Sequence, residues 1–114
     1  MLGINRNPIL LTDSYKLSHA DQYPPGTSNI YSYFEARQGA QFPEMVFFGL
    51  QYSLKAYLAH QLTQDHIDEA DEMVTAHLGT EAVFNRKGWE YILKEHKGRM
   101  PVRICAVPEG TVLP

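Results

Sequence analysis

Three stretches of apolar residues at helical spacing constrain the fold of this 114-residue chain more than any other feature. They cover residues 46–62, 67–78 and 89–93. Apolar residues that recur every three to four positions form one face of an amphipathic helix, and that face has to be buried. Thr63 is placed to cap the second helix, while Gly79 and Gly98 are placed to end the second and the third. We therefore predict helices that share a core, and the first has the strongest pattern.

A shorter helix is predicted near the N-terminus. Thr12-Asp13 follows the apolar run Ile9-Leu10-Leu11 and is a suitable helix start, because Thr and Asp side chains accept hydrogen bonds from free backbone N–H groups. The helix has to end before Tyr23-Pro24-Pro25-Gly26, which reads as a turn.

Two further segments have the pattern of β-strands. Residues 29–35 carry β-branched and aromatic side chains on both faces, which indicates a strand covered on both sides. Residues 102–107 alternate before the tight turn Pro108-Glu109-Gly110, and residues 111–113 start a further strand.

The predicted hairpin stops in its second strand, at Pro114. Such an edge is left unpaired, so we expect either that more sequence follows or that a partner completes the sheet. The expected fold class is α+β: a small antiparallel sheet packed with three to four helices, incomplete at its C-terminal edge. No repeat or linker divides the chain, so residues 1–114 are expected to form a single domain.

Composition and charge exclude several functions. Charged residues make up 20% of the chain, and the net charge of −3 gives no basic field for a nucleic-acid partner. The single cysteine, Cys105, cannot form an internal disulfide, which fits a reducing compartment. No apolar stretch has the length of a membrane span. We expect a soluble, cytoplasmic protein without a membrane partner.

Residue patterns for metal and phosphate chemistry are weak. The five histidines form no HExxH pair and are best interpreted as exposed or capping side chains. The carboxylates at 65, 68, 69, 71 and 72 lie near a predicted helix N-terminus, where the helix dipole alone favours them, and we interpret them as a solvated face. No glycine-rich phosphate loop is present. We expect no metal site in this chain.

The segment Leu10 to Lys16 leaves two interpretations open. The simpler one is a helix cap with a packed tyrosine, and the residues alone favour it. In the functional one, the ring of Tyr15 stacks on an aromatic ligand while Asp13 accepts its hydrogen bonds. Arg37 is likewise either a surface cation or a fork that binds phosphate.

Six motifs in a fixed order give a more specific signal. They are Thr12-Asp13-Ser14-Tyr15-Lys16, Gln22-Tyr23-Pro24-Pro25, Tyr31-Ser32-Tyr33-Phe34-Glu35, Phe48-Gly49-Leu50-Gln51-Tyr52, Phe84-Asn85-x-x-Gly88-Trp89 and Val107-Pro108-Glu109-Gly110. Together they resemble the N-terminal region of nicotinamide phosphoribosyltransferases, from about Leu10 to Pro114. The Pro-Glu-Gly turn is shared with nicotinate phosphoribosyltransferases and is weak by itself.

The resemblance implies a function and a set of residues. Enzymes of this family join nicotinamide to phosphoribosyl pyrophosphate and release nicotinamide mononucleotide and pyrophosphate for NAD salvage. They are homodimers with active sites at the subunit interface. The resemblance makes Tyr15 the aromatic that stacks on nicotinamide in the neighbouring subunit, with Asp13 beside it, and makes Arg37 a phosphate contact.

The resemblance also implies what this chain does not contain. The family's catalytic histidine, its second stacking aromatic and the groups that hold Mg²⁺ and the phosphoribosyl moiety belong to a later α/β barrel. No catalytic residue and no bound cofactor are therefore expected within the 114 residues, although Mg²⁺ is expected for the full enzyme. Two alternatives stay open: a non-catalytic assembly module that pairs with a separate barrel domain, and the N-terminal domain of a nicotinate phosphoribosyltransferase.

Overall fold

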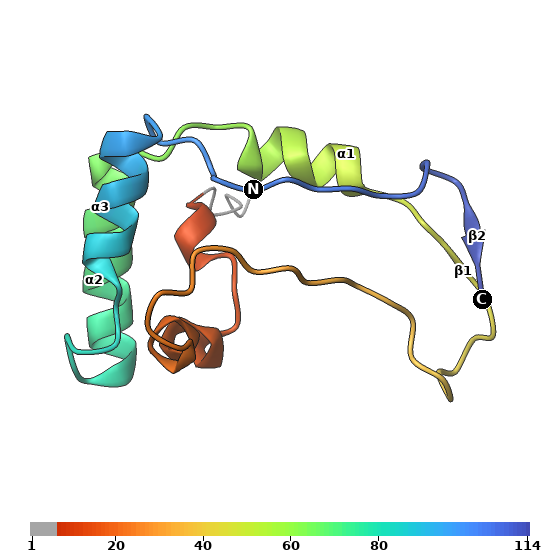
Figure 1. Ribbon diagram of the computed structural model, residues 1–114, viewed down its shortest axis with the longest axis horizontal. Coiled ribbons are helices and arrows are strands. Elements are labelled where there is room, and N and C mark those ends of the chain that lie inside the picture. Colours follow the sequence, from red (N-terminus) through yellow and green to blue (C-terminus); the bar gives the residue numbers. More distant parts are fainter. Residues whose placement is uncertain (1–6) are drawn as a thin grey trace, which may run out of the picture.

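The computed structural model describes residues 7–114 and combines short and long helices with one small sheet. In chain order the elements are η1 (Pro8–Leu10), η2 (Ser14–Gln22), β1 (Met45–Val46), α1 (Leu50–Ser53), η3 (Leu54–Leu58), α2 (Gln64–Leu78), α3 (Arg86–Glu95) and β2 (Val112–Leu113). Figure 1 shows the helices α2 and α3 at one end and the antiparallel pair β1–β2 at the other. The predicted α+β class is confirmed.

Helix α2 begins and ends where the sequence predicts. The hydroxyl of Thr63 accepts from the backbone N–H of His66 at 3.3 Å, and Nδ1 of His66 accepts from the N–H of Thr63 at 3.2 Å. This reciprocal capping box satisfies two backbone donors that the helix itself leaves free. Gly79 follows the last helical residue and ends the helix in a left-handed conformation.

Helix α3 packs against α2 and is closed at both ends by local hydrogen bonds. The side chain of Asn85 accepts from the N–H of Gly88 at 3.0 Å, and the N–H of Gly98 donates back to the carbonyl of Ile92 at 3.1 Å. The predicted third helix and its closing glycine are both confirmed.

The core of the described chain lies between α2, α3 and η1. Its buried side chains are those of Ile9, Leu62, Ile67, Ala70, Val74 and Phe84. Asn7 connects η1 to α2 from within: its amide nitrogen donates to the carbonyl of His66 and to a carboxylate oxygen of Glu69, both at 2.8 Å. Because Asn7 is buried, these hydrogen bonds offset the cost of removing its amide from water.

The strongest predicted helix is wrong in its extent. Helical structure covers only residues 50–58, as α1 and the π-helical turn η3, and none of these residues is buried. Met45 and Val46 instead pair with Leu113 and Val112 in the sheet. The reason is tertiary: the first apolar residues of the periodic stretch bind a strand that lies more than sixty positions later in the chain.

The predicted strands at 29–35 and 102–107 are also corrected. Both segments run in extended form without a β partner among the described residues. Tyr31 is 94% exposed, and Phe34 is fully exposed, so this segment is not covered on either side. Strand-forming side chains produce a sheet only where a second chain segment supplies hydrogen bonds, and here none does.

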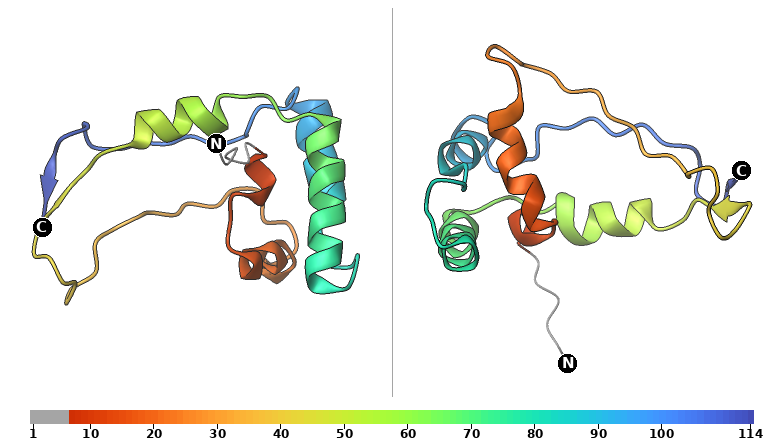
Figure 2. Two further views of the ribbon diagram at one scale, coloured as in Figure 1. Left: turned by 180° about the vertical axis from the view of Figure 1, so that it is seen from behind. Right: turned by 90° about the horizontal axis from the view of Figure 1, so that it is seen from below.

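These uncovered segments give the molecule an open shape. Two extended segments and α1 lead from the helices to the distant sheet, as all views show (Figures 1 and 2). The radius of gyration is 16.5 Å, whereas a compact domain of this length has about 13 Å. The accessible surface is 9744 Å², against about 6,300 Å² for a compact monomer of the same mass. A large surface is therefore left unburied.

No helix in the part of the chain that the structure describes is long and apolar enough to cross a membrane.

Candidate functional site

Helix η2 positions two of the three residues that the sequence singles out. Asp13 stands at the N-cap of η2, but its side chain makes no capping hydrogen bond; it pairs with the ammonium of Lys16 at 3.5 Å. Both side chains of this ion pair are at least half exposed. The carboxylate of Asp13 therefore keeps acceptor capacity toward solvent.

Tyr15 lies one residue into η2, and its ring is open to solvent. The ring is 64% exposed, packs edge-on against His19 with 5.6 Å between ring centroids, and has the Lys16 ammonium 5.9 Å from its centre. In this structure Tyr15 is therefore exposed and is not part of the helical core. An exposed phenol ring can stack on a flat ligand, and an exposed carboxylate two residues away in sequence can accept hydrogen bonds.

Arg37 lies elsewhere in the described chain. It begins a turn in which its carbonyl accepts from the N–H of Ala40 at 3.3 Å, and its side chain is exposed. The extended segment after η2 carries the turn at residues 37–40 away from this helix (Figure 1). Within one copy of the chain, the structure does not bring Arg37 together with the other two residues.

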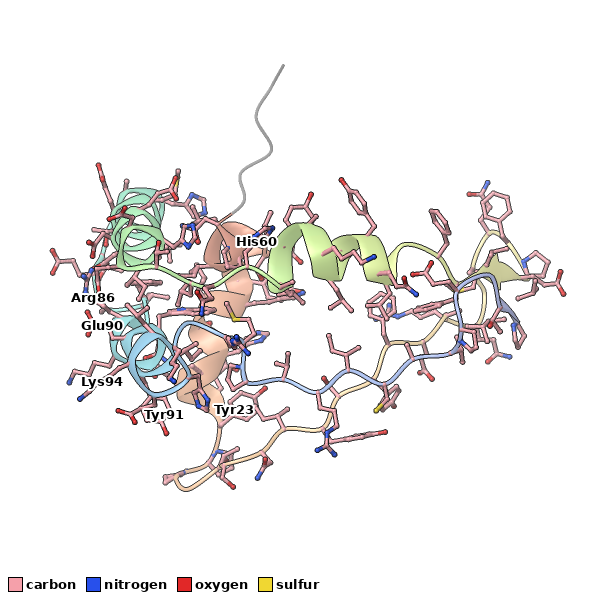
Figure 3. All side chains as sticks on the ribbon, turned by 90° about the horizontal axis from the view of Figure 1, so that it is seen from above. Tyr23, His60, Arg86, Glu90, Tyr91 and Lys94 are labelled. Atoms are coloured by element: carbon pink, nitrogen blue, oxygen red, sulfur yellow. The ribbon has the colours of Figure 1, made fainter. Side chains whose placement is uncertain are left out.

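The acidic stretch of α2 is more than a solvated face. Arg86, at the start of α3, makes hydrogen-bonded ion pairs with Asp68, with Asp71 at 2.7 Å and with Glu90 at 2.9 Å. Figure 3 shows Arg86 and Glu90 near each other on the outer side of the helix pair. The earlier interpretation is thus corrected: two of these carboxylates join α2 to α3, and Glu69 binds Asn7.

The charges in this network reinforce one another. Hydrogen bonds to Asp71, Asp68 and Glu90 raise the pKa of Arg86, so that it stays protonated. The hydrogen bond from Arg86, and then that from Gln64, lowers the pKa of Asp68. Because these groups are exposed, the network fixes geometry more than it adds stability.

The histidines follow their predicted interpretation. His66 caps α2, whereas His19 and His96 lie exposed against the tyrosine rings of Tyr15 and Tyr91. Within residues 7–114, no group of three or more His, Cys, Asp or Glu residues is arranged to hold a metal ion.

Glu109 is a residue of structural importance that the sequence reasoning missed. Its two carboxylate oxygens accept from the backbone N–H groups of Gly49 and Gln51, each at 2.9 Å. The hydrogen bond from Gln51, and then that from Gly49, lowers the pKa of Glu109. The Pro-Glu-Gly turn was the only signal, and a turn does not reveal a partner about sixty positions away.

Comparison with known proteins assigns the family. The family model "Nicotinamide phosphoribosyltransferase, N-terminal domain" matches residues 7–104. The chain belongs to this family. The match includes Asp13, Tyr15 and Arg37, and it ends before Glu109.

Curated relatives agree with this membership. A nicotinamide phosphoribosyltransferase of Xanthomonas campestris pv. campestris (strain 8004) is 44% identical over 108 residues, which is 95% of this chain and 22% of the relative. The nicotinamide phosphoribosyltransferase of Acinetobacter baylyi is 31% identical over 92% of the chain and 23% of its own length. The chain thus spans less than a quarter of these relatives.

Three of the motifs that carry the resemblance have a structural explanation. Asn85 and Gly88 of Phe84-Asn85-x-x-Gly88-Trp89 form the N-terminal cap of α3. Phe48-Gly49-Leu50-Gln51-Tyr52 contacts the Pro-Glu-Gly turn through Glu109. The motif with Asp13 and Tyr15 differs, because its side chains are exposed and are not needed for the core.

Proposed function

We propose that this chain acts as the N-terminal part of a nicotinamide phosphoribosyltransferase and supplies one side of its nicotinamide pocket. The observation that carries the proposal is that Tyr15 and the carboxylate of Asp13, two residues apart, are both exposed within the region matched by the family model. A neutral, flat pyridine ring is bound chiefly by stacking, while its carboxamide N–H groups need an acceptor. Tyr15 and Asp13 supply these two interactions.

Arg37 is proposed to contact a phosphate group of phosphoribosyl pyrophosphate. An arginine binds phosphate through parallel N–H donors, and fixed positive charge stabilises a pyrophosphate leaving group. Since Arg37 is remote from Tyr15 in one copy, the proposal places the two residues in different active sites of a homodimer. The large accessible surface of the single chain supports burial against further protein.

The catalytic groups and the Mg²⁺ site of the reaction are assigned to protein outside this chain. The described residues do not fit a magnesium site, since no three or more of their His, Cys, Asp or Glu side chains are arranged to hold a metal ion. By this proposal the 114-residue chain alone is catalytically silent.

A second candidate function is a non-catalytic assembly module. The extended segments 29–35 and 102–107 expose aromatic and β-branched side chains, which favours a protein partner that covers them. This holds whether or not the chain and that partner belong to one polypeptide. The nicotinate-specific alternative differs only in the ligand. Asp13 argues against it, because a carboxylate in place of the carboxamide would be repelled by the Asp13 carboxylate.

A hybrid enzyme tests the proposed function. This chain would replace the matching 108-residue region of the Xanthomonas relative, and formation of mononucleotide would be measured with nicotinamide and with nicotinate. We expect activity with nicotinamide and none for the 114-residue chain alone. A folded hybrid that is inactive, or that prefers nicotinate, contradicts the proposal. Activity on mixing the chain with a separately expressed remainder of the relative would favour the assembly module.

A further inference from the structure

Helix α1 begins at a residue that cannot cap it. Its N-cap is Gly49, which has a φ of 100° and no side chain to accept a hydrogen bond. The first N–H groups of a helix have no partner within the helix and normally find one in a Ser, Thr, Asp or Asn at the N-cap. A φ this positive disfavours those residues here, because a side chain strains the left-handed backbone.

Glu109 supplies the missing acceptor from far along the chain. Its Oε2 accepts from the N–H of Gly49 and its Oε1 from that of Gln51. Negative charge at this position also interacts favourably with the helix dipole. The neighbouring backbone is joined as well: the N–H of Gly110 donates to the carbonyl of Phe47 at 2.7 Å, and that of Phe47 donates to the carbonyl of Thr111 at 2.8 Å.

Neither half of this arrangement is expected to be stable by itself. The helical stretch of α1 and η3 covers nine residues, 50–58, without a buried side chain. Isolated helices shorter than about 12 residues are marginal in water. The sheet pairs only two residues of each strand. Even a two-stranded hairpin, whose strands are joined by a turn, is marginal by itself, and these two strands have no such connection.

We infer that Glu109 is a long-range helix cap that makes α1 and the β1–β2 strand pair one cooperative unit. We call residues 45–58 and 108–113 the clasp. The clasp closes the open end of the molecule, whereas the other end is held by the core of α2, α3 and η1 (Figure 2). This inference does not depend on the proposed enzymatic function.

Amide hydrogen exchange of the 114-residue chain tests the inference, with Glu109→Ala and Glu109→Gln compared with the wild type. Glu44→Ala is the matched control, because Glu44 directly precedes β1 and is exposed. For Glu109→Ala, we expect protection of the Gly49, Gln51 and Gly110 amides to fall together by about 3- to 30-fold, the range for loss of a helix cap. The Cα chemical shifts of residues 50–58 should become less helical, while the α2 amides stay protected.

The outcomes separate a cooperative clasp from simpler roles. Loss of protection at Gly49 and Gln51 alone, with Gly110 unchanged, would reduce Glu109 to a local cap and overturn the inference. An equal effect of Glu44→Ala would overturn it as well. If Glu109→Ala unfolds the whole chain, Glu109→Gln decides, because its amide keeps one acceptor oxygen without the charge. A partial loss of amide protection confined to the clasp supports the inference. A loss of protection that spreads into α2 contradicts it.

Discussion

A carboxylate oxygen of Glu109 and the backbone N–H of Gly49 are joined by a 2.9 Å hydrogen bond across sixty positions of sequence. The second oxygen of the same carboxylate binds the N–H of Gln51. This relationship connects two of the motifs named above, and it makes the closure of the open end sensitive to acid.

Acid should open the clasp. The two hydrogen bonds lower the pKa of Glu109 below its ordinary value of 4.5. A lowered folded-state pKa means that the stabilisation is fully present above the unfolded pKa and is lost as the pH falls through the folded one. We expect the Gly49 amide resonance to shift with this transition in an NMR titration below neutral pH. A side-chain pKa for Glu109 at or above the ordinary value would contradict the prediction.

Replacement of Gly98 by alanine should destabilise the helical core. Gly98 has a φ of 74°, and an added Cβ would overlap the carbonyl oxygen of Leu62, whose N–H donates to the Gly98 carbonyl at 2.8 Å. The strain of the left-handed backbone and the contact together should cost more than about 1 kcal/mol in the free energy of unfolding. Thermal or urea unfolding measures this cost. Gly79→Ala is the control, since its φ is also positive and nothing lies near its added Cβ.

Loss of Arg86 should weaken the contact between α2 and α3. Without its guanidinium, Asp68, Asp71 and Glu90 would face one another as uncompensated like charges. We expect a lower unfolding temperature for Arg86→Ala, with the largest decrease at low salt. The exposed neighbour Lys87, replaced in the same way, serves as the control. An Arg86 variant that is as stable as the wild type at low salt would contradict the prediction. It would show that packing alone holds α2 against α3 and that the ion pairs add no stability.

Tyr15→Ala should reduce nicotinamide use in the hybrid enzyme without affecting its folding. Loss of a stacking partner costs about 1–3 kcal/mol, which appears as a decrease in kcat/KM for nicotinamide. Tyr91→Ala is the matched control, because Tyr91 is 59% exposed and also packs edge-on against a histidine at 5.6 Å. If both variants behave alike, Tyr15 has no special role in binding the ring.

Arg37→Ala should act on the other substrate. Removal of a phosphate contact is expected to raise the KM for phosphoribosyl pyrophosphate in the hybrid enzyme and to leave that for nicotinamide unchanged. Arg103→Ala is the control, because Arg103 is an exposed arginine of the other extended segment, residues 102–107. An unchanged response to phosphoribosyl pyrophosphate would remove Arg37 from the proposed site.

The candidate site could be predicted only in part. Asp13 and Tyr15 came from one of the ordered motifs, and Arg37 from its place just after another. The structure adds that all three are exposed and that the turn at residues 37–40 lies away from η2. Glu109 was not recognised, because a carboxylate in a turn has no sequence pattern that reveals which backbone it will bind.

The sequence by itself determined α2, α3, their caps and the fold class. These features depend on residues within about four positions of one another, such as Thr63 with His66 or Asn85 with Gly88. Only the tertiary structure decided that Met45 and Val46 form a strand rather than a helix, and that residues 29–35 and 102–107 remain unpaired. The physical reason is that a strand here depends on a partner distant in sequence. The residue pattern shows that a segment is able to form a strand, and the tertiary structure decides whether a partner is there to pair with it.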